Sequence, residues 1–593
     1  MQYRPEIDGL RALAVLPVIF FHGGFEIFRG GFVGVDIFFV ISGYLITSII
    51  LSDLKNNNFS IINFYERRAR RILPALFLIS FVSLIFGYFF LLPDEFKNLG
   101  QSFVSTFLFA NNILLAMTSG YWDLDSEFKP LLHTWSLGVE EQYYAIVPIL
   151  FLISLKLGRL GIVIVIWAIF LLSFIFANWF IYISPDWAFY ILPTRAWEIC
   201  LGALVAFYFK NRSFKNLNYK FANFLSFLGL VLILFSIFTF DKYIINPGWP
   251  LLIPTFGTVL IILFGNINSI VNRMLRNRIL VFLGLISYSL YLWHQPFFAY
   301  LRAYSLNEPN YQNYLYLLPF IFVISFFTWK YIETPFRNKN VISSKFIFIF
   351  SISLSLIFII IGISINKNYG MPSRIFSDEI NKNDIDKRIY NQRVYSYKKD
   401  NFSKKSSTTI LIVGNSFARD FVNITLENFN ISNTEIIYRD DLKECIVQMS
   451  NEEKFRLYDD AEVIVFASGD YKQECYTEDI SFAKSRGKKI FYIGTKDFGY
   501  NLNWLIKLKE NNRSNKYNSI SLKTINLDKK MAHLIPPENY ISIMKPTVVK
   551  GKIPITDAYG RILSTDRRHL TKYGAIYFGQ KAIVSSLYAD IFK

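Results

Sequence analysis

Three residues in the last third of the chain have the types and spacing that serine acyl transfer requires. Ser416 follows a β-branched apolar run and a glycine in TTILIVGNSFARDF, which predicts a strand, a turn and the start of a helix. Such a turn exposes a hydroxyl where backbone N–H groups stabilise an oxyanion. Asp566 and His569, three residues apart in STDRRHLTKYGA, face the same way in a turn or helix start. The three supply a nucleophile, a base and an orienting carboxylate, whereas separately they are equally explained as helix caps and a surface histidine.

A second group of reactive residues lies in the first apolar segment. Arg11 and His22 are eleven positions apart, and at about 100° per residue that spacing returns them to one helical face, roughly 16 Å apart along the axis. A charge in an apolar span costs at least ~2.5 kcal/mol by insertion scales, so each such residue needs a reason. Snorkelling to headgroups explains Arg11 alone equally well, but the pair favours a function.

Four arginines form a basic cluster immediately before another apolar segment, in RRARRILPAL. They are Arg67, Arg68, Arg70 and Arg71. Guanidinium groups at the mouth of a span can bind phosphates through planar, multidentate hydrogen bonds. The simpler interpretation is a topology signal that binds anionic lipid. Together with Arg11 on the same membrane face, the cluster indicates a phosphorylated cytosolic ligand.

Further polar residues lie in or near the apolar segments. Arg195 and Glu198, three apart on one predicted helix, are expected to form a structural ion pair. For His133 and His294, interfacial anchoring competes with a role on the acceptor side. With these two histidines, the candidates for a membrane-domain site are Asp36, Glu140 and Glu141, while Ser42 and Glu333 are further polar residues of the apolar segments.

The elements that must position these residues follow from composition and hydropathy. The chain has 593 residues, 52% of them hydrophobic, with 60 Phe and 36 Tyr, and a mean hydropathy of +0.30. This composition excludes an ordinary soluble protein, a disordered chain and collagen. We expect about ten membrane spans, a re-entrant segment at 98–117 and one linking span. The spans are predicted near 8–24, 31–52, 72–92, 136–155, 161–183, 187–209, 222–240, 248–266, 279–300, 313–333 and 346–365.

Four parts of the chain are expected: a membrane domain at 1–340, a linking helix at 341–366, a linker or packed extension at 367–407, and a domain at 408–593. In the last part short β-branched runs alternate with helical stretches, which predicts an α/β domain with a mostly parallel sheet. Its strand candidates are TTILIVG, TEIIYRD, EVIVFAS, KKIFYIG and ENYISIM.

The charge distribution predicts the orientation. Lys and Arg outnumber Asp and Glu by 63 to 45, for a net charge of +18, and on a membrane protein such an excess indicates cytoplasmic loops and not a nucleic-acid partner. Basic clusters near 55–71, 156–159, 210–220, 273–278 and 337–345 place the N-terminus in the cytoplasm and the C-terminal domain outside it. In that oxidising compartment a disulfide between Cys445 and Cys475 is favoured over two free thiols. No metal site is expected, because zinc spacing is absent.

Several blocks together resemble the acyltransferase family 3 membrane proteins. They are YRPEIDGLRALAVLPVIFFH, GGFVGVDIFFVISGYLI, RRARRILPAL, LLHTWSLGVEEQYY and SYSLYLWHQPFF, in the family's order over residues 1 to about 340. Arg11 and His22 match its Arg-x10-His motif, and Arg68 to Arg71 its Arg-x-x-Arg motif. The resemblance implies transfer of an acyl group, usually acetyl, from a cytosolic donor to a carbohydrate across the membrane. Arg11, Arg68 and Arg71 would hold the phosphates of coenzyme A, and His22 would act in the transfer as base or transient nucleophile.

The C-terminal domain resembles the SGNH hydrolases over roughly 408–593. Gly414-Asn415-Ser416 stands in place of the family's Gly-Asp-Ser block, and Asp566 to His569 match its Asp-x-x-His block. The middle Gly and Asn blocks are not placed, since Ser468-Gly469-Asp470 holds the position of one of them but lacks the Asn. The resemblance therefore implies the triad and leaves the oxyanion hole open.

The fusion of the two modules resembles bacterial surface polysaccharide O-acetyltransferases. It implies an inner-membrane enzyme that takes acetyl from acetyl-CoA and passes it through Ser416 to a glycan hydroxyl. Lipopolysaccharide O-antigen is the first expected acceptor, and peptidoglycan or another exopolysaccharide the alternative. Other classes remain open: a membrane transporter, which leaves the triad without a task; a glycan O-acetyl esterase, which does not need the arginines; and a sensor that binds glycan without chemistry.

Overall fold

The computed structural model of the chain describes residues 3–118, 126–154, 158–211, 219–265, 269–375, 387–403, 408–442, 445–446 and 452–592. These residues form two compact units. The helical unit comprises Met1–Tyr88, Lys97–Arg302 and Pro309–Lys367, and the sheet unit comprises Phe89–Phe96, Ala303–Glu308 and Asn368–Lys593. Parts of two expected basic loops, 155–157 and 212–218, and parts of the expected linker, 376–386 and 404–407, lie outside the described residues.

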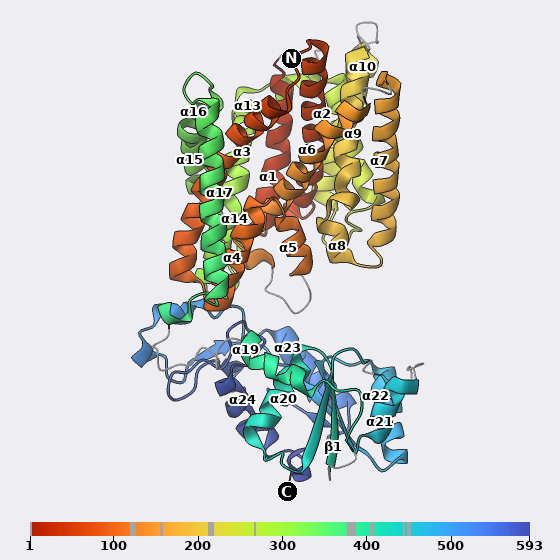
Figure 1. The fold of residues 1–593 in the computed structure, drawn as a ribbon, viewed down its shortest axis with the longest axis vertical. Helices are drawn as coiled ribbons and strands as arrows, with labels where there is room; N and C mark the ends of the chain where they lie inside the picture. The colour runs from red at the N-terminus through yellow and green to blue at the C-terminus, as the bar shows by residue number, and fades with distance from the viewer. Residues whose placement is uncertain are drawn as a thin grey trace. The chain divides into compact units, whose positions relative to one another are not determined.

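Helices make up the helical unit and run side by side (Figure 1). Within the described residues, seven helical segments are long and apolar enough to cross a membrane: Gly31–Lys55, Ile61–Phe90, Leu160–Phe180, Pro185–Tyr208, Tyr219–Thr239, Tyr311–Arg337 and Ser344–Lys367. The main helices of these segments are α2 (Gly34–Lys55), α3 (Ile61–Phe90), α7 (Gly158–Phe180), α9 (Leu192–Asn211), α10 (Tyr219–Thr239), α15 (Tyr311–Thr328) and α17 (Ser344–Lys367). Each overlaps an expected span, but the helix expected from 72 already begins at Ile61, so the arginine cluster lies within the helix and not in the loop before it.

The other expected spans are also helices, but they are shorter or more polar. They correspond to α1 (Pro5–His22), α6 (Thr134–Ser154), α11 (Leu252–Phe264), and α13 (Arg278–Leu285) followed by α14 (Ser287–Tyr304). The polarity of α1 has a structural reason, because Glu6, Asp8 and Arg11 are all buried in the unit. Buried charges of this kind are retained in apolar helices when they pair with one another or serve a site.

The segment expected to be re-entrant is broken in two. Helix α4 (Pro93–Phe107) ends before residues 108–110, and α5 (Asn111–Met117) follows. Phe109 has a φ of 51°, which ends the helix. Asn111 and Asn112 at the start of α5 are buried, and Asn112 donates to the carbonyl oxygen of Tyr190. Polar side chains thus satisfy backbone groups at an interruption, as apolar surroundings require.

Glycines let helices α2 and α9 of the helical unit approach closely. A Cβ on Gly43 of α2 would lie 1.9 Å from the carbonyl oxygen of Ile199 in α9, and one on Gly202 of α9 would lie 2.0 Å from that of Val40. Any side chain at either position would therefore force the two backbones apart. This contact places α2, which carries Asp36 and Ser42, against α9, which carries Arg195 and Glu198.

The sheet unit is a doubly wound α/β domain. Its five strands have the order β2-β1-β3-β4-β6, and every adjacent pair is parallel. The strands are β1 (Thr408–Val413), β2 (Thr434–Arg439), β3 (Val463–Gly469), β4 (Lys489–Gly494) and β6 (Tyr540–Ile541), as the β-branched runs predicted. A short antiparallel pair, β5 (Tyr517–Ser519) with β7 (Lys552–Pro554), was not anticipated.

Helices cover both faces of this sheet. Ile410 and Ile412 of β1 point into a core shared with α20 (Ser416–Asn428) and α24 (Lys572–Phe578). Leu411 and Val413 point to the opposite face, towards α21 (Glu452–Asp460), α22 (Gln473–Ser485) and α23 (Leu522–Leu534). Burial of both faces explains why the strands read as continuous apolar runs without alternation.

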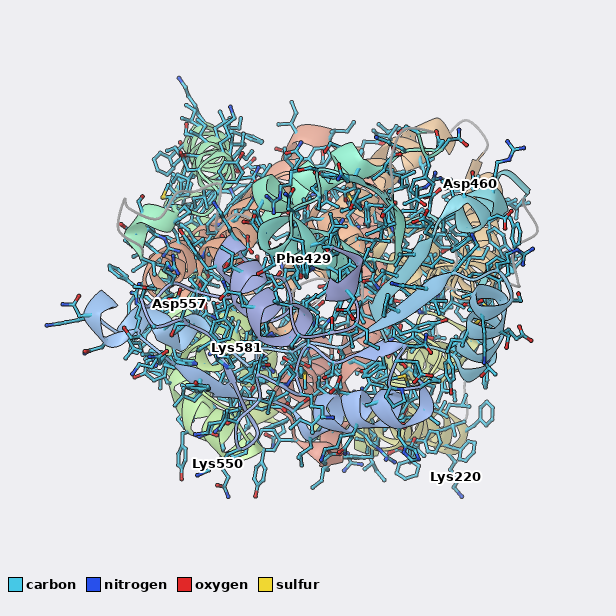
Figure 2. All side chains as sticks on the ribbon, turned by 90° about the horizontal axis from the view of Figure 1, so that it is seen from below. Lys220, Phe429, Asp460, Lys550, Asp557 and Lys581 are labelled. Carbon is cyan, nitrogen blue, oxygen red and sulfur yellow. A yellow bond between two sulfur atoms is a disulfide. The ribbon has the colours of Figure 1, made fainter. Side chains whose placement is uncertain are left out.

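The C-terminal residues and the segment before β1 both pack against the core that contains α20. Phe429, which follows α20 and is labelled in Figure 2, stacks on Phe592 with ring centroids 4.5 Å apart. At the other end, α19 (Lys387–Gln392) and the turn after it pack on α20, where Arg393 donates to Asn423 and Glu427. The described residues at 387–403 are therefore an extension packed on the domain, one of the two expected forms.

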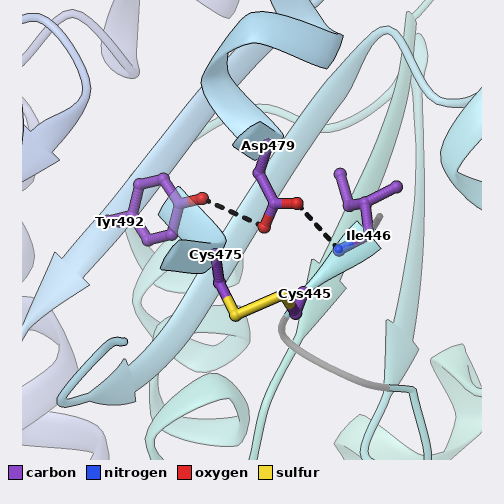
Figure 3. The surroundings of a disulfide bond; sticks show 5 residues. All are labelled: Cys445, Ile446, Cys475, Asp479 and Tyr492. Carbon is purple, nitrogen blue, oxygen red and sulfur yellow. Dashed lines mark hydrogen bonds between the residues drawn. A yellow bond between two sulfur atoms is a disulfide. The ribbon is translucent and has the colours of Figure 1, made fainter. Parts of the chain in front are cut away.

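The expected disulfide between Cys445 and Cys475 is present (Figure 3). Beside it, Asp479 of α22 accepts hydrogen bonds from the Ile446 backbone N–H, at 2.8 Å, and from the Tyr492 hydroxyl, at 3.3 Å. The bridge thus fastens the segment after β2 to α22 and, through Asp479, to β4.

Removing this bridge is expected to destabilise the sheet unit by about 3 to 4 kcal/mol, because it closes a loop of 30 residues in the unfolded chain. The double variant Cys445→Ser, Cys475→Ser should show the loss in urea unfolding of the full chain, followed by proteolysis of the C-terminal region. Cys200→Ser is the control, since Cys200 is a free buried thiol of the helical unit. An unchanged unfolding midpoint in the double variant would contradict the expectation.

Candidate active site

Ser416 lies at a strand-to-helix turn, and its hydroxyl forms no hydrogen bond with the described residues. Strand β1 ends at Val413, Gly414 adopts a φ of 142°, and α20 begins at Ser416. Asn415 is the N-cap, since its Oδ1 accepts from the Phe417 N–H at 2.9 Å. Ser416 is buried, and its Oγ has no hydrogen-bond partner among the described residues. The helix-cap alternative for Ser416 is therefore wrong, because Asn415 fills that role.

The turn sits where ligands bind in open parallel sheets. In the order β2-β1-β3, the chain leaves β1 towards one edge of the sheet and later returns to its other side, so the crevice opens between the carboxyl ends of β1 and β3. A Cβ on Gly414 would meet the carbonyl oxygen of Ala467 at 2.4 Å and Ser468 Oγ at 3.0 Å. Only glycine permits this approach of the nucleophile turn to the end of β3.

Ser468 occupies the position where the resemblance implies a further oxyanion donor. Its hydroxyl is buried and has no partner within the described residues. Its backbone N–H donates to the Tyr471 hydroxyl at 3.0 Å, and that hydroxyl donates to the carbonyl oxygens of Phe466 and Ile493. Tyr471 therefore holds the turn after β3 and places an unused hydroxyl beside Gly414.

Asp566 orients His569 as a general base requires. Asp566 Oδ2 lies 2.5 Å from His569 Nδ1, and Asp566 Oδ1 accepts from the His569 backbone N–H at 2.8 Å. Because a carboxylate accepts, Nδ1 carries the proton and Nε2 is left as the basic nitrogen. Arg567 between them has a φ of 72°, and its carbonyl oxygen accepts from the Phe498 N–H at 2.8 Å. Strain of this kind persists only where surrounding contacts enforce it, and it gathers at functional sites.

Asp420 connects the nucleophile helix to the histidine segment. It lies one helical turn after Ser416 in α20, and its Oδ2 accepts from the Leu570 N–H at 3.1 Å, the residue next to His569. No hydrogen bond joins Ser416 Oγ to His569, a common condition in a site without substrate. The buried Asp420 carboxylate thus connects the helix that carries Ser416 to the segment that carries His569.

A buried lysine neutralises that carboxylate. Lys496 Nζ lies 2.9 Å from Asp420 Oδ2 and 3.5 Å from the ring centroid of Phe417, and both charged side chains are 1% exposed. Desolvation lowers the pKa of Lys496, while Asp420 opposes that shift. Sequence reasoning missed this pair, because neither residue belongs to a recognisable motif and the two are far apart in the chain.

The helical unit contains a cavity that three arginines line. It holds about 870 Å³ of empty space, open solvent included. Arg11 from α1 and Arg68 and Arg71 from α3 all line it, together with Ser42, Ser136, Glu140, Tyr144, Tyr288 and Tyr291. The fold therefore brings Arg11, Arg68 and Arg71 to the lining of one cavity, as the sequence led us to expect.

The three arginines differ in their partners. Arg11 donates to Asp8 at 3.2 Å, and Arg68 donates to Glu141 at 2.6 Å and lies over the Tyr144 ring. Arg71 has no hydrogen bond or ion pair to any residue that the structure describes. The cavity therefore presents a guanidinium group without an ion-pair partner among the described residues, which favours an anionic ligand.

The other arginines of the cluster do not share this role. Arg67 is 41% exposed and pairs with Asp53, while buried Arg70 pairs with Glu66 at 2.8 Å and donates to two backbone carbonyls. A spacing of three residues on α3 selects Arg68 and Arg71 for the cavity. Glu140 also reaches it, and accepts from Ser42 at 3.0 Å.

Three histidines gather near one end of this cavity. Tyr291, which lines the cavity, packs against the rings of His133 and His294. His294 Nε2 lies 2.9 Å from His22 Nδ1, and the two rings stack at 5.2 Å. His294 and His133 are 0% and 1% exposed, so interfacial anchoring does not describe either of them. His22 itself is absent from the cavity lining formed by the described residues.

Asp36 belongs to a separate buried ion cluster. Arg195 Nη1 donates to Asp36 at 2.9 Å and to Glu198 at 3.0 Å, and all three side chains are almost fully buried. The expected Arg195–Glu198 pair is present, with Asp36 as a second acceptor that the sequence did not indicate. Glu333 is likewise buried and pairs with Arg337 and Ser289. These carboxylates hold helices together and do not line the cavity.

These features define a polytopic membrane protein with a cation-lined cavity, joined to an α/β domain with a serine site. The chain belongs to the acyltransferase 3 family, whose model, described as "Acyltransferase domain", matches residues 4–334. Peptidoglycan O-acetyltransferase OatA of Listeria monocytogenes is 34% identical over 358 residues, and O-acetyltransferase OatA of Staphylococcus aureus is 29% identical over 362 residues. The matches cover 58% of this chain, and 57% and 59% of those proteins. No solved structure matches.

Proposed function

We propose that this protein is a transmembrane O-acetyltransferase. It takes acetyl from cytosolic acetyl-CoA, and it delivers acetyl to a hydroxyl of a glycan outside the cytoplasm. The observation that carries the proposal is the cavity at which Arg11, Arg68 and Arg71 meet within the matched acyltransferase region. A transporter would leave the serine site unused, and an esterase would not need the arginines.

The arginines suit the phosphates of coenzyme A. Asp8 and Glu141 already compensate two of the guanidinium groups, so Arg71 is the group that gains most from a phosphate. A bidentate guanidinium–phosphate contact adds geometric selection to charge. His22 lies on the same helix as Arg11, roughly 16 Å along its axis, so an extended carrier arm bound at the arginines would point its thioester towards the histidines.

The proposed orientation puts the N-terminus in the cytoplasm and the sheet unit outside, in the inner membrane of a bacterium. The basic clusters support it through the positive-inside rule. The Cys445–Cys475 disulfide supports it independently, because disulfides persist in oxidising compartments.

Ser416 performs the last transfer in this proposal. His569 Nε2 takes the proton from Ser416 Oγ as the oxygen attacks the carbonyl carbon of the acyl donor. The bond between the acyl carbon and the donor breaks, His569 gives its proton to the leaving group, and the acyl group becomes an ester of Ser416. A glycan hydroxyl then gives its proton to His569 and attacks the ester, after which His569 returns the proton to Ser416. Asp566 stabilises the imidazolium in both steps.

For the acceptor we propose peptidoglycan ahead of lipopolysaccharide O-antigen. The relative from Listeria monocytogenes carries peptidoglycan in its name, and its match covers 58% of this chain. Mass spectrometry of muropeptides and NMR of surface polysaccharide, in cells with and without this chain, separate the two acceptors. O-acetyl groups that disappear only from the polysaccharide would favour O-antigen.

The arginine assignment predicts a specific loss in Arg71→Ala. One charge-assisted hydrogen bond contributes about 1.5 to 3 kcal/mol, so the Kd for coenzyme A should rise about 10- to 150-fold. Calorimetry on the full chain in nanodiscs measures it, and transfer of labelled acetyl from acetyl-CoA should fall in parallel. Arg67→Ala is the matched control, because Arg67 has the same charge in the same cluster but pairs with Asp53 outside the cavity. Equal losses in both variants would refute the assignment.

A further inference from the structure

The hydrogen bonds of His294 determine where its proton resides. His294 Nδ1 lies 2.6 Å from the backbone carbonyl oxygen of Tyr291. A carbonyl oxygen only accepts, so Nδ1 must carry the hydrogen. In the neutral ring Nε2 then holds a lone pair and acts as an acceptor.

That acceptor fixes the tautomer of the next histidine. His22 Nδ1 is 2.9 Å from His294 Nε2, so His22 must donate from Nδ1 and keep its own lone pair on Nε2. The two residues are 272 positions apart in the sequence and meet only through the packing of α1 and α14. His22 is partly exposed, whereas His294 is fully buried, so the free nitrogen belongs to the accessible ring.

A cation lies beside the histidine pair. Arg302 donates to the backbone carbonyl oxygen of His22 at 2.7 Å, which places a cation beside the rings. Glu127, the carboxylate that pairs with Arg302 at 3.4 Å, is 67% exposed. Neither nitrogen of His133 has a hydrogen-bond partner in the described part of the chain, so that ring contributes contact only.

We propose that His294 is a positioning residue that holds His22 in the Nε2 lone-pair tautomer and accepts its Nδ1 proton during acyl transfer. The arrangement parallels a serine triad, with the Tyr291 carbonyl orienting His294 as a carboxylate orients a catalytic histidine. This inference rests on the proposed function, since it assigns His22 as the first acyl acceptor in the membrane.

In this step the acyl group moves from sulfur to nitrogen. His22 Nε2 attacks the thioester carbonyl carbon; a C–N bond forms, and the C–S bond breaks with its electron pair leaving on sulfur. The Nδ1 proton of His22 passes to His294 Nε2, so the acylated imidazole is neutral and His294 becomes an imidazolium. His294 then gives this proton up to the thiolate, which leaves as the thiol. The starting state returns when an acceptor hydroxyl attacks the acyl carbon, the C–N bond breaks, and the hydroxyl proton passes through His294 to His22 Nδ1. Without His294, the acylated ring would keep a positive charge near Arg302.

Nitrogen NMR of the full chain in nanodiscs, labelled with 15N-histidine, tests the tautomer directly. The chain has only five histidines, and the His22→Gln variant assigns the His22 signals by their loss. We expect protonated Nδ1 and unprotonated Nε2 on His22 in the wild type. A wild-type His22 protonated on Nε2 overturns the proposal.

Two substitutions at position 294 separate the two parts of the role. His294→Phe keeps a ring but has no acceptor, so His22 should lose its tautomer preference, and acetyl loading should fall about 10²-fold or more. His294→Gln can place an amide oxygen near the former Nε2, so it should restore the tautomer while loading stays low. His133→Leu, which removes a neighbouring ring without a hydrogen bond, should leave the His22 tautomer unchanged. A His22 tautomer that is the same in His294→Phe as in the wild type overturns the proposal.

The readouts also distinguish this inference from the proposed function. Coenzyme A binding and acetyl transfer by the wild type report on the proposed function, and their absence refutes it whatever the tautomer. The NMR signals report on His294 without any substrate. If wild-type transfer proceeds and both position-294 variants load acetyl at the wild-type rate, the positioning role fails while the proposed function stands.

Discussion

Ser416→Ala is expected to lower O-acetyl transfer to the glycan by at least about 10³-fold, because it removes the hydroxyl that forms the acyl ester in the proposed mechanism. Coenzyme A binding by the full chain should not change, since Ser416 does not line the arginine cavity. Muropeptide acetylation in cells and labelled acetyl transfer by the purified chain both measure the effect.

The control for Ser416→Ala is Ser481→Ala. Ser481 is an exposed residue of α22 whose hydroxyl donates to the Thr477 carbonyl oxygen, so its loss should leave transfer unchanged. Wild-type acetylation by the Ser416→Ala chain would mean that the sheet unit binds glycan without performing chemistry. If the Ser416→Ala variant loses transfer to the glycan but still loads acetyl on His22, the step that fails is the one after acetylation of His22.

Lys496→Met is expected to destabilise the sheet unit by about 3 to 5 kcal/mol, because it leaves the Asp420 carboxylate buried without a counter-charge. Acetyl transfer should also fall, because Asp420 accepts a hydrogen bond from the Leu570 N–H and so holds the segment that carries His569. Urea unfolding of the full chain, followed by proteolysis of the C-terminal region, measures the stability term.

Two further variants make the Lys496 result interpretable. Lys496→Met combined with Asp420→Asn removes both charges and keeps a hydrogen-bond acceptor, so it should recover much of the lost stability. Arg486→Ala breaks an exposed pair with Asp459, and should cost less than about 1 kcal/mol. A loss below that figure in Lys496→Met itself would show that Asp420 is not a buried anion.

The elements were largely predictable because their signals are local. The strands from β1 to β4 follow β-branched runs, and the long apolar helices follow stretches that match the thickness of a bilayer. The Ser416 turn and the Asp566–His569 pair were also predictable, since each lies within a few residues of chain. The break between α4 and α5 was indicated only by the alternation of charged loops, because its own residues are apolar enough to form one helix.

Side-chain partnerships were predictable only when both partners share a helix. Arg195 and Glu198 are three residues apart, so their pair was expected, but Asp36 in the same cluster comes from another helix. Asp36 was therefore a candidate for a functional site until the fold showed its partner. Tyr291 gave no signal at all, because its contribution to the histidine pair is a backbone carbonyl oxygen that every residue type supplies.

Amino-acid order alone determined the two-part architecture, the strands, the apolar helices, and the identities of Ser416, His569, Arg11 and Arg71 as residues with chemical potential. Tertiary structure decided which charges are paired: Asp420 with Lys496 and Arg68 with Glu141, whereas Arg71 has no hydrogen bond or ion pair within the described chain. It also brought His22 to His294. The physical reason is that apolarity and turn chemistry act between neighbours in sequence, whereas desolvation, ion pairing and tautomer choice depend on groups that meet only after packing.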